Sequence, residues 1–327
     1  MLVTGGTGQI GAYVSAELAS RGHKVTIFDL NPNPDNLSVI PSNKPDVVKG
    51  DVLNSDQLMH ALKSHEITHV VHLAALLVLE SKQNPSRALQ VNCVGTSNIF
   101  EAARQSDIQR VVFTSSVAVY GSKRYFPRNI VNEDDFPHCP IDPYSITKLT
   151  NELTGEHYRR AYRMDVLCLR LAGAWGPGRY TGYTGQFNDF IRKAGAGAEA
   201  RLPEDFAFKD AKLRWMYVKD AGACIAHATL VDKARVRRGL YNAGTSKPFN
   251  SFHVIKLLKN YLPDNDRITY KETSEPTELS AGIAGPSGLD VDCSRLYGEL
   301  GFVEKMDLSH GVSDMINLGR GAIPSLI

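Results

Sequence analysis

The sequence contains few cysteines, and their spacing does not suggest a shared site. The 327 residues include five cysteines, at positions 93, 139, 168, 224 and 293, with no CxxC pair and no spacing typical of metal ligands. An odd, dispersed set is typical of reduced thiols in a protein core rather than of a disulfide framework. We therefore expect no metal site and a cytoplasmic location.

Charge of one sign and long apolar runs are also lacking. Lys and Arg total 37 against 35 for Asp and Glu, which gives a formal net charge of +2. Binding of nucleic acid or an anionic membrane usually requires a basic patch, so we expect neither partner. The longest apolar run, residues 70–79, is interrupted by His72 and is too short to span a bilayer. The first residues also lack the basic and apolar segments of a secretory signal.

The remaining pattern is that of an α/β protein. Short apolar runs alternate with amphipathic stretches through the first half, which predicts a doubly wound parallel sheet of the Rossmann type. We expect strands at 2–4, 24–28, 47–48, 69–73, 110–115 and 165–171. We expect helices at 10–19, 85–104, 142–163, 252–261, 294–300 and 308–318.

These elements suggest one large unit and a smaller one. Residues 1–171 are expected to form a dinucleotide-binding domain, to which strands near 215–243 return (215–218 and 240–243). Residues 172–214 and 245–327 are expected to form a smaller C-terminal substrate lobe. A chain of this length suits one large core with an appended lobe.

A glycine-rich turn joins the first strand to the first helix. Gly5, Gly8 and Gly11 allow a tight turn and a close approach of the backbone to a pyrophosphate. The helix that follows offers free N–H groups at its positive end, with Gln9 and Ile10 in its first turn. A glycine pattern alone is weak evidence, but its place between a strand and a helix predicts a dinucleotide site.

The predicted cofactor is NAD. Asp29 follows the second strand, 18 residues after Gly11, where a carboxylate can accept both hydroxyls of the adenosine ribose. Residues 30–37 contain no Arg or Lys to neutralise the extra phosphate of NADP. The alternative is an ordinary exposed aspartate at the end of a strand.

A Tyr-x-x-x-Lys pair follows the fifth strand. Tyr144 and Lys148 are four residues apart on a predicted helix and therefore share one face. An ammonium there is expected to lower the pKa of the phenol, which would make it an acid or base near neutral pH. Ser116, at the carboxyl end of the fifth strand, is the expected third member. Ser115 is the alternative if the strand slips by one residue.

Longer motifs surround these residues. They are TGGTGQIG (4–11), HLAA (72–75), VNCVGTSNIFEAAR (91–104), FTSSVAVYG (113–121), YSITK (144–148), LRLAGAWGPG (169–178), RWMYVKD (214–220) and YNAG (241–244). In combination they resemble the NAD-dependent epimerase/dehydratase family, the extended short-chain dehydrogenases typified by UDP-galactose 4-epimerase.

The resemblance implies roles for further residues. It implies that Asp51 and Val52 contact the adenine and that Leu73, Ala74, Ala75 and Asn92 help to bind the cofactor. Tyr144 and Lys148 would hold the nicotinamide ribose, and Ser116 would complete a catalytic triad with them. Ser116, Tyr144, Gly173 and Arg214 would bind substrate. It also implies a homodimer formed through helices matching 85–104 and 143–163.

The chain departs from the family pattern at three places. Ser116-Val117-Ala118 replaces the Thr-Asp-Glu of the dehydratases, which disfavours dehydration. Gly173 replaces the asparagine of the UDP-sugar epimerases. No arginine between Arg267 and Arg295 is present to clamp a diphosphate, although Arg214 matches a substrate-binding arginine.

Three functions follow from these patterns. The first is an NAD-dependent sugar-type epimerase or dehydrogenase that acts on a sugar or sugar nucleotide. The second is an NAD-dependent dehydrogenase of a non-nucleotide sugar, sugar acid or polyol. The third, from another class, is a catalytically silent protein that senses a dinucleotide.

Overall fold

The computed structural model describes residues 1–40, 44–137, 140, 142–262, 266–277 and 287–321. A seven-stranded sheet with order β11-β7-β5-β4-β1-β2-β3 lies at its centre, and all neighbouring strands are parallel. Its strands are β1 (Leu2–Thr4), β2 (Thr26–Asp29), β3 (Asp46–Lys49), β4 (His69–His72), β5 (Arg110–Ser116), β7 (Val166–Leu171) and β11 (Leu240–Ala243). The order reverses between β1 and β4, so the predicted doubly wound sheet is confirmed.

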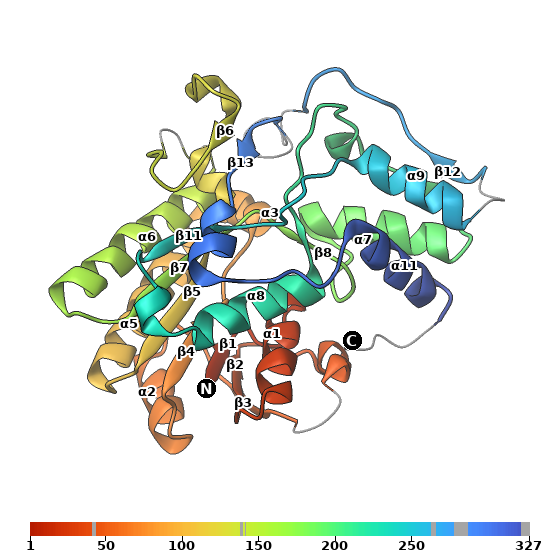
Figure 1. Ribbon diagram of the computed structural model, residues 1–327. Helices are drawn as coiled ribbons and strands as arrows, with labels where there is room; N and C mark the ends of the chain where they lie inside the picture. The colour runs from red at the N-terminus through yellow and green to blue at the C-terminus, as the bar shows by residue number, and fades with distance from the viewer. Residues whose placement is uncertain (41–43, 138–139, 141, 263–265, 278–286, 322–327) are drawn as a thin grey trace.

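Helices cover both faces of this sheet (Figure 1). One face carries α1 (Gln9–Ser20) and α8 (Val218–Leu230). The other carries α2 (Ser55–Ser64), α5 (Gly95–Gln105) and α6 (Pro143–Ala161). Alternate strand residues point to opposite faces: Val71 and Val112 pack toward α1 and α8, whereas Val70 and Val111 pack toward α2 and α5. This explains why the strands have continuous apolar runs.

Helix α6 begins where its sequence predicts. The Asp142 side chain accepts a hydrogen bond from Ser145 N at 3.0 Å, and Pro143 occupies the first turn. The helix ends at Ala161, close to the expected residue 163, and Arg163 has a positive φ of 55°.

The helix expected at 85–104 is interrupted by a wider turn. It consists of α4 (Pro85–Ala88), a π-helical segment η2 (Leu89–Val94) and α5. Within η2, the Asn92 side chain accepts a hydrogen bond from Leu76 N at 2.8 Å and donates to Thr147 Oγ1 at 3.0 Å. The segment therefore connects the chain after β4 to the helix that carries Tyr144.

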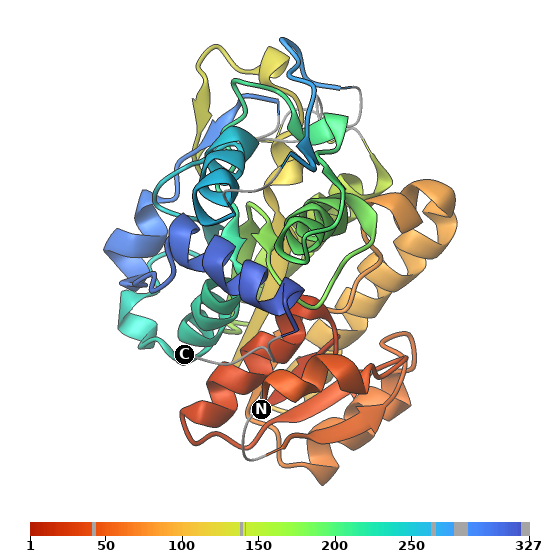
Figure 2. The ribbon, with the colours of Figure 1, turned by 90° about the vertical axis from the view of Figure 1, so that its right-hand side faces the viewer.

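Three helices of the second half lie together in the lobe (Figure 2). Their buried side chains form a separate, largely aromatic core. They are α7 (Gly182–Gly195), α9 (Ser251–Tyr261) and α11 (Leu308–Gly319). Trp175, Phe187, Phe206 and Trp215 are fully or almost fully buried at the centre of this core. Three short pairs accompany the lobe: β8 (Ala174–Trp175) with β10 (Met216–Tyr217), β9 (Ala200–Arg201) with β12 (Ile268–Thr269), and β6 (Ile130–Val131) with β13 (Asp290–Val291).

Two expectations about the second half need correction. Residues 240–243 join the central sheet as β11, but β10 pairs only with β8 and does not return to that sheet. Leu296 and Leu300 were expected in the lobe, yet they pack in the hydrophobic cluster of α1 and α8 because η7 (Leu296–Leu300) lies against the edge of the sheet. Among the helices of the described ranges, none is long and apolar enough to cross a membrane.

Candidate active site

A pocket of about 750 Å³ lies at the carboxyl ends of the central strands, between the sheet and the lobe. Its lining includes the predicted cofactor residues Gly5, Gly8, Gln9, Ile10, Gly11, Asp29, Asp51, Val52, Leu73, Ala74 and Ala75. It also includes Ser116, Tyr144, Lys148 and Gly173. Residues predicted from separate parts of the sequence therefore surround one cavity at the switch point of the sheet.

The glycine turn has the shape that a pyrophosphate requires. Gly5 has a φ of +64°, and a Cβ at Gly11 would lie 2.3 Å from Gly5 O, so a side chain cannot fit there. Helix α1 then starts without a side-chain cap, which leaves its first N–H groups facing the pocket. This cradle fits the phosphates of a dinucleotide.

Asp29 is held beside the glycine turn. Its Oδ2 accepts hydrogen bonds from Thr7 N at 3.1 Å and from Thr7 Oγ1 at 2.6 Å. Thr7 is thus a positioning residue that sequence reasoning missed. The pocket wall just beyond Asp29 is formed by Leu30, Asn31 and Asn33, which are neutral. A ribose with free hydroxyls fits this end of the pocket better than a 2′-phosphate.

Tyr144, Lys148 and Ser116 meet at the other end of the pocket. Tyr144 and Lys148 lie one turn apart on α6, and the Lys148 Nζ is 5.5 Å from the centroid of the Tyr144 ring. Lys148 Nζ donates to Thr114 O at 2.7 Å, which fixes the ammonium against β5. Ser116, the last residue of β5, hydrogen bonds with the Tyr144 phenol. The three side chains thus form a contiguous polar group.

The expected lowering of the Tyr144 pKa is wrong. Burial raises the pKa of Tyr144 to about 12, although the hydrogen bond with Ser116 opposes the rise. Burial also lowers the pKa of Lys148 to about 8. The physical reason is that the ammonium points at Thr114 O and is itself desolvated, so it does little to stabilise a phenolate.

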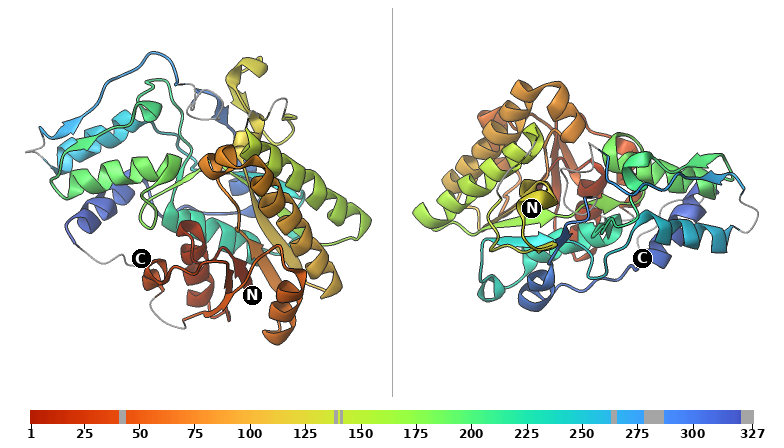
Figure 3. Two further views of the ribbon diagram at one scale, coloured as in Figure 1. Left: turned by 180° about the vertical axis from the view of Figure 1, so that it is seen from behind. Right: turned by 90° about the horizontal axis from the view of Figure 1, so that it is seen from above.

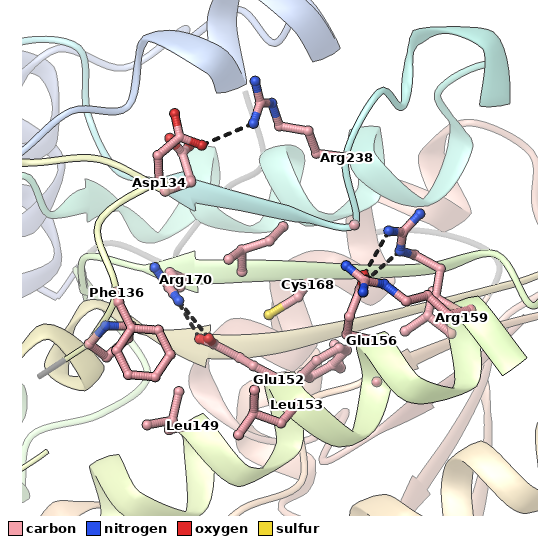
Figure 4. A pocket seen from close by; sticks show the side chains of 18 of the residues that line it. Asp134, Phe136, Leu149, Glu152, Leu153, Glu156, Arg159, Cys168, Arg170 and Arg238 are labelled. Atoms are coloured by element: carbon pink, nitrogen blue, oxygen red, sulfur yellow. Dashed lines mark hydrogen bonds and ion pairs between the residues drawn. The ribbon is translucent and has the colours of Figure 1, made fainter.

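The structure distinguishes the two candidate serines. Ser115 Oγ donates to Glu152 Oε1 at 2.5 Å, and Glu152 forms a buried ion pair with Arg170 at 2.7 Å. This pair lies at the floor of a second pocket of about 400 Å³, between α6 and β7 (Figure 4). Ser115 also lines the main pocket, but its hydroxyl is engaged by Glu152, whereas Ser116 faces Tyr144.

Three predicted contacts differ from expectation. Asn92 does not line the main pocket because its amide is used by Leu76 and Thr147. Arg214 does not line it either: its guanidinium makes a two-point ion pair with Asp290, at 2.6 and 3.1 Å. Gln9 lines the pocket, but its side-chain amide donates to Gly176 O at 2.8 Å.

Gly173 lines the pocket for a packing reason. Its φ is +134°, and a Cβ there would lie 2.4 Å from the Trp215 ring. The indole therefore occupies the space that a side chain at this position would need. Trp215 is a pocket residue that sequence reasoning missed.

Arg179 is a third residue that sequence reasoning missed. It follows the GPG sequence of the LRLAGAWGPG motif and lines the main pocket near Tyr144. An arginine next to a glycine-rich loop looks like surface chemistry in the sequence, and only the fold shows that this loop closes one side of the pocket.

His72 is a buried core residue whose two ring nitrogens are both hydrogen-bonded, as its apolar neighbours predict. Its Nδ1 lies 2.7 Å from Thr4 Oγ1 and its Nε2 lies 2.9 Å from Thr96 Oγ1. Burial lowers its pKa to about 3, so it stays neutral. In the part of the chain that the structure describes, no group of three or more His, Cys, Asp and Glu residues could hold a metal ion.

The chain is similar to known epimerases and dehydrogenases. An uncharacterised protein of Methanocaldococcus jannaschii is 31% identical over 97% of this chain and 95% of that protein. A UDP-glucose 4-epimerase of Azospirillum brasilense is 27% identical over 95% of this chain and 89% of that enzyme.

Solved structures share the whole fold. The UDP-glucose 4-epimerase of Thermotoga maritima, solved with UDP-glucose, has a TM-score of 0.82 at 24% identity and covers 98% of both chains. The L-threonine dehydrogenase of Clostridium difficile has a TM-score of 0.80 at 23% identity and covers 97% of this chain and 96% of that one.

The family is shown by the sequence match itself. The model of the NAD dependent epimerase/dehydratase family matches residues 1–244, which include the glycine turn, Ser116, Tyr144 and Lys148. Together with a fold shared over nearly the whole chain, this means that the protein is an NAD-dependent enzyme and belongs to the NAD-dependent epimerase/dehydratase family.

Proposed function

We propose that this enzyme oxidises a secondary alcohol, with Tyr144 as the acid and base, Lys148 as its cationic neighbour and Ser116 as the group that orients the oxygen. The observation that supports this most is the convergence of these three side chains at one end of a pocket whose other end is the glycine turn. A protein that only senses a dinucleotide has no physical need for such a group.

The roles follow from the chemistry of each side chain. When bound, NAD supplies an acceptor for the hydride that leaves the alcohol carbon. Tyr144 takes the proton from the alcohol oxygen, which leaves a ketone. Ser116 donates a hydrogen bond to the same oxygen and keeps it within reach of the phenol. Lys148 provides positive charge and hydrogen bonds near the ribose that carries the nicotinamide.

The fate of the ketone separates the two activities. If the ketone stays in the pocket, rotates and is reduced on its other face, the enzyme is an epimerase. If it leaves, the enzyme is a dehydrogenase. The experiment is to incubate purified protein and NAD with sugars and nucleotide sugars, following NADH absorbance and analysing the product. Accumulating NADH indicates a dehydrogenase, and an isomer without NADH indicates an epimerase. If no compound in the panel gives NADH or an isomer, the proposal that the protein is a catalyst is contradicted.

The cofactor preference can be measured separately. We expect NAD to bind more tightly than NADP because Asp29 faces the ribose site and the neighbouring wall is neutral. Isothermal titration calorimetry of both cofactors checks this, and equal affinities would remove the argument from Asp29.

The substrate is either a sugar nucleotide or a smaller alcohol. Relatives named UDP-glucose 4-epimerase favour a sugar nucleotide. The engagement of Arg214 by Asp290 and the indole beside Gly173 favour the second candidate, a dehydrogenase of a non-nucleotide sugar, sugar acid or polyol.

The setting of the enzyme is also part of this proposal. We infer a homodimer formed through α4, α5 and α6, which lie side by side on one outer face (Figure 3). We infer a cytoplasmic location, which agrees with the free thiols of Cys93, Cys168, Cys224 and Cys293. Cys139 lies outside the described residues.

A further inference from the structure

Arg179 brings a positive charge into the reactive end of the pocket. It lines the same cavity as Tyr144 and Ser116, and its charge is close enough to Tyr144 to help lower the pKa of that phenol. Lys148 is also nearby, but its ammonium is committed to Thr114 O. Arg179 is therefore the guanidinium best placed to meet a substrate held at Tyr144.

The guanidinium of Arg179 is largely uncompensated. Its Nε donates a hydrogen bond to Thr181 O at 3.0 Å, and no carboxylate within the described ranges forms an ion pair with it. The contrast is Arg214, which Asp290 neutralises at two points. Glu80 on α3 (Val78–Gln83) lines the pocket too and acts on Arg179 only at longer range. A partly buried cation of this kind favours an anionic partner.

The backbone around Arg179 is held firmly. Asn188, which is fully buried on α7, donates to Arg179 O at 2.9 Å and accepts from Gly176 N at 2.8 Å. Gln9 donates to Gly176 O and Pro177 O from the other side of the pocket. The loop that carries Arg179 is thus tied both to the lobe and to the glycine turn, which sets the position of its side chain in advance.

A second source of positive potential lies beside this arginine. Helix α7 begins at Gly182 after Thr181, whose side chain does not cap it, so its first N–H groups have no side-chain acceptor. Thr181 and Thr184 line the pocket with Arg179. The guanidinium and the helix start therefore both favour negative charge at this point.

We propose that the substrate carries a carboxylate and that Arg179 binds it while Tyr144 and Ser116 hold the secondary hydroxyl. This inference rests on the proposed function. One planar guanidinium matches one carboxylate through two parallel hydrogen bonds. A neutral sugar would leave this cation unpaired when the substrate excludes water from the pocket. The substrate class is accordingly a hydroxy acid, such as a uronic acid or a hydroxy amino acid.

The test compares each acid with a partner that lacks the carboxylate. The panel is UDP-glucuronate with UDP-glucose, D-galacturonate with D-galactose, and L-threonine with L-threoninol. Binding to the NAD-loaded protein is measured by calorimetry, and turnover by NADH formation and product analysis. Wild type is compared with Arg179→Ala, Arg179→Lys and the control Arg192→Ala. Arg192 lies on α7, pairs with Asp189 and does not line the pocket.

We expect at least one acid to bind more tightly than its partner without the carboxylate. Arg179→Ala should weaken the binding of that acid by roughly 10- to 100-fold and raise its KM, because a charge-assisted hydrogen-bonded pair is lost. Arg179→Lys should recover part of the loss, since it keeps the charge but not the two-point geometry. Arg192→Ala should behave as wild type.

Two results would overturn the inference. One is that no acid in the panel binds better than its partner. The other is that the preferred acid binds Arg179→Ala as tightly as wild type. A preference for UDP-glucose, whose sugar has no carboxylate, with product formed, would refute the carboxylate and leave the proposed function standing. Failure of the proposed function has a different signature: the acid binds and depends on Arg179, but neither NADH nor an isomer forms.

Discussion

At the scale of single residues, burial keeps the Tyr144 phenol protonated near neutral pH. Burial raises the pKa of the phenol to about 12, and burial lowers the pKa of Lys148 to about 8. Near neutral pH Tyr144 is therefore a proton donor, and Lys148 is the group whose charge changes first as the pH rises. Proton removal from an alcohol requires that this balance shift when the pocket is filled.

Replacing Tyr144 with Phe tests the acid and base directly. The substitution keeps the ring and deletes the hydroxyl, so the free energy of unfolding should change little. Turnover should fall by at least roughly 100-fold, the typical loss for a general acid or base. Steady-state kinetics and urea denaturation measure the two effects. Tyr162→Phe, at the exposed end of α6, is the control. Near-wild-type turnover of folded, NAD-bound Tyr144→Phe would contradict the mechanism.

The buried ammonium of Lys148 predicts a dependence of stability on pH. Its pKa is lower in the folded chain, about 8, than the unfolded value of 10.5, so the unfolded state holds more protons between these values. The free energy of unfolding should therefore rise with pH from 8 to 10.5, by up to about 3 kcal/mol, and stay flat below 8 with respect to this group.

The comparison that isolates Lys148 is the variant Lys148→Met. Other groups titrate alike in both proteins. The free energy of unfolding of the wild type should therefore rise relative to that of the variant over this pH window. Urea denaturation at pH 7, 8, 9 and 10 without ligand measures it. A difference that is constant with pH would mean that the ammonium is not desolvated.

At the scale of elements, α6 serves both pockets. Tyr144 and Lys148 face the main pocket, and Glu152 continues the same face two turns beyond Tyr144, where it bonds Ser115 and Arg170. Arg170 on β7 also donates to the Tyr120 hydroxyl at 2.8 Å. This buried network fastens α6 to β5 and β7, and it therefore sets the distance between Ser116 and Tyr144.

Breaking this ion pair should cost more than replacing it. Arg170→Met leaves the Glu152 carboxylate buried without its partner, so the free energy of unfolding should fall by about 3–5 kcal/mol. The double variant Arg170→Met with Glu152→Leu removes both charges and should recover much of the loss. Chemical denaturation of the two variants measures this coupling. Equal losses in both would show that the ion pair contributes little beyond packing.

The sequence predicted the elements that have a local signal. The strands alternate with helices, α6 has an Asp-Pro start, and the glycine turn has its spacing, so the sheet and most of the main pocket could be derived from the sequence. Helix α8 was not predicted because eleven of its residues are buried and its apolar pattern has no polar face. Arg214 was expected in the pocket and Arg179 was given no role, yet Arg179 lines the pocket and Arg214 does not. Long-range contacts with Asp290 and with the lobe decide which arginine faces the pocket.

At the scale of the whole molecule, one outer face carries exposed apolar residues. Leu89 and Val94 on the α4–α5 segment are 49% and 51% exposed, and Ile146 and Leu153 on α6 are 44% and 60% exposed. Contiguous apolar side chains on adjacent helices are typical of a subunit interface. The inferred homodimer would cover this face and support the back of the active-site helix.

Charge placed on this face should separate the subunits. Val94→Arg and Ile146→Arg add a guanidinium at exposed positions, so the monomer fold should tolerate them while the dimer should not. Size-exclusion chromatography with light scattering at micromolar concentration measures the mass. The control is Val303→Arg, at a position 73% exposed; its neighbour Phe302 packs in the cluster of α1 and α8 on the other face of the sheet. A monomeric wild type, with or without NAD, would refute the dimer.

The π-helical segment Leu89–Val94 has a consequence for the length of this part of the chain. A turn of this kind has the geometry that one inserted residue leaves in a regular α-helix. Deleting exposed Gln90 would restore regular winding, but it would rotate α4 by about 100° relative to Asn92 and α5. Asn92 would keep its bond to Thr147 while the chain before it, including Arg87 on the pocket wall, would turn away. A shorter and more regular helix would therefore make a worse enzyme, and length variation should be tolerated less here than in the surface turns.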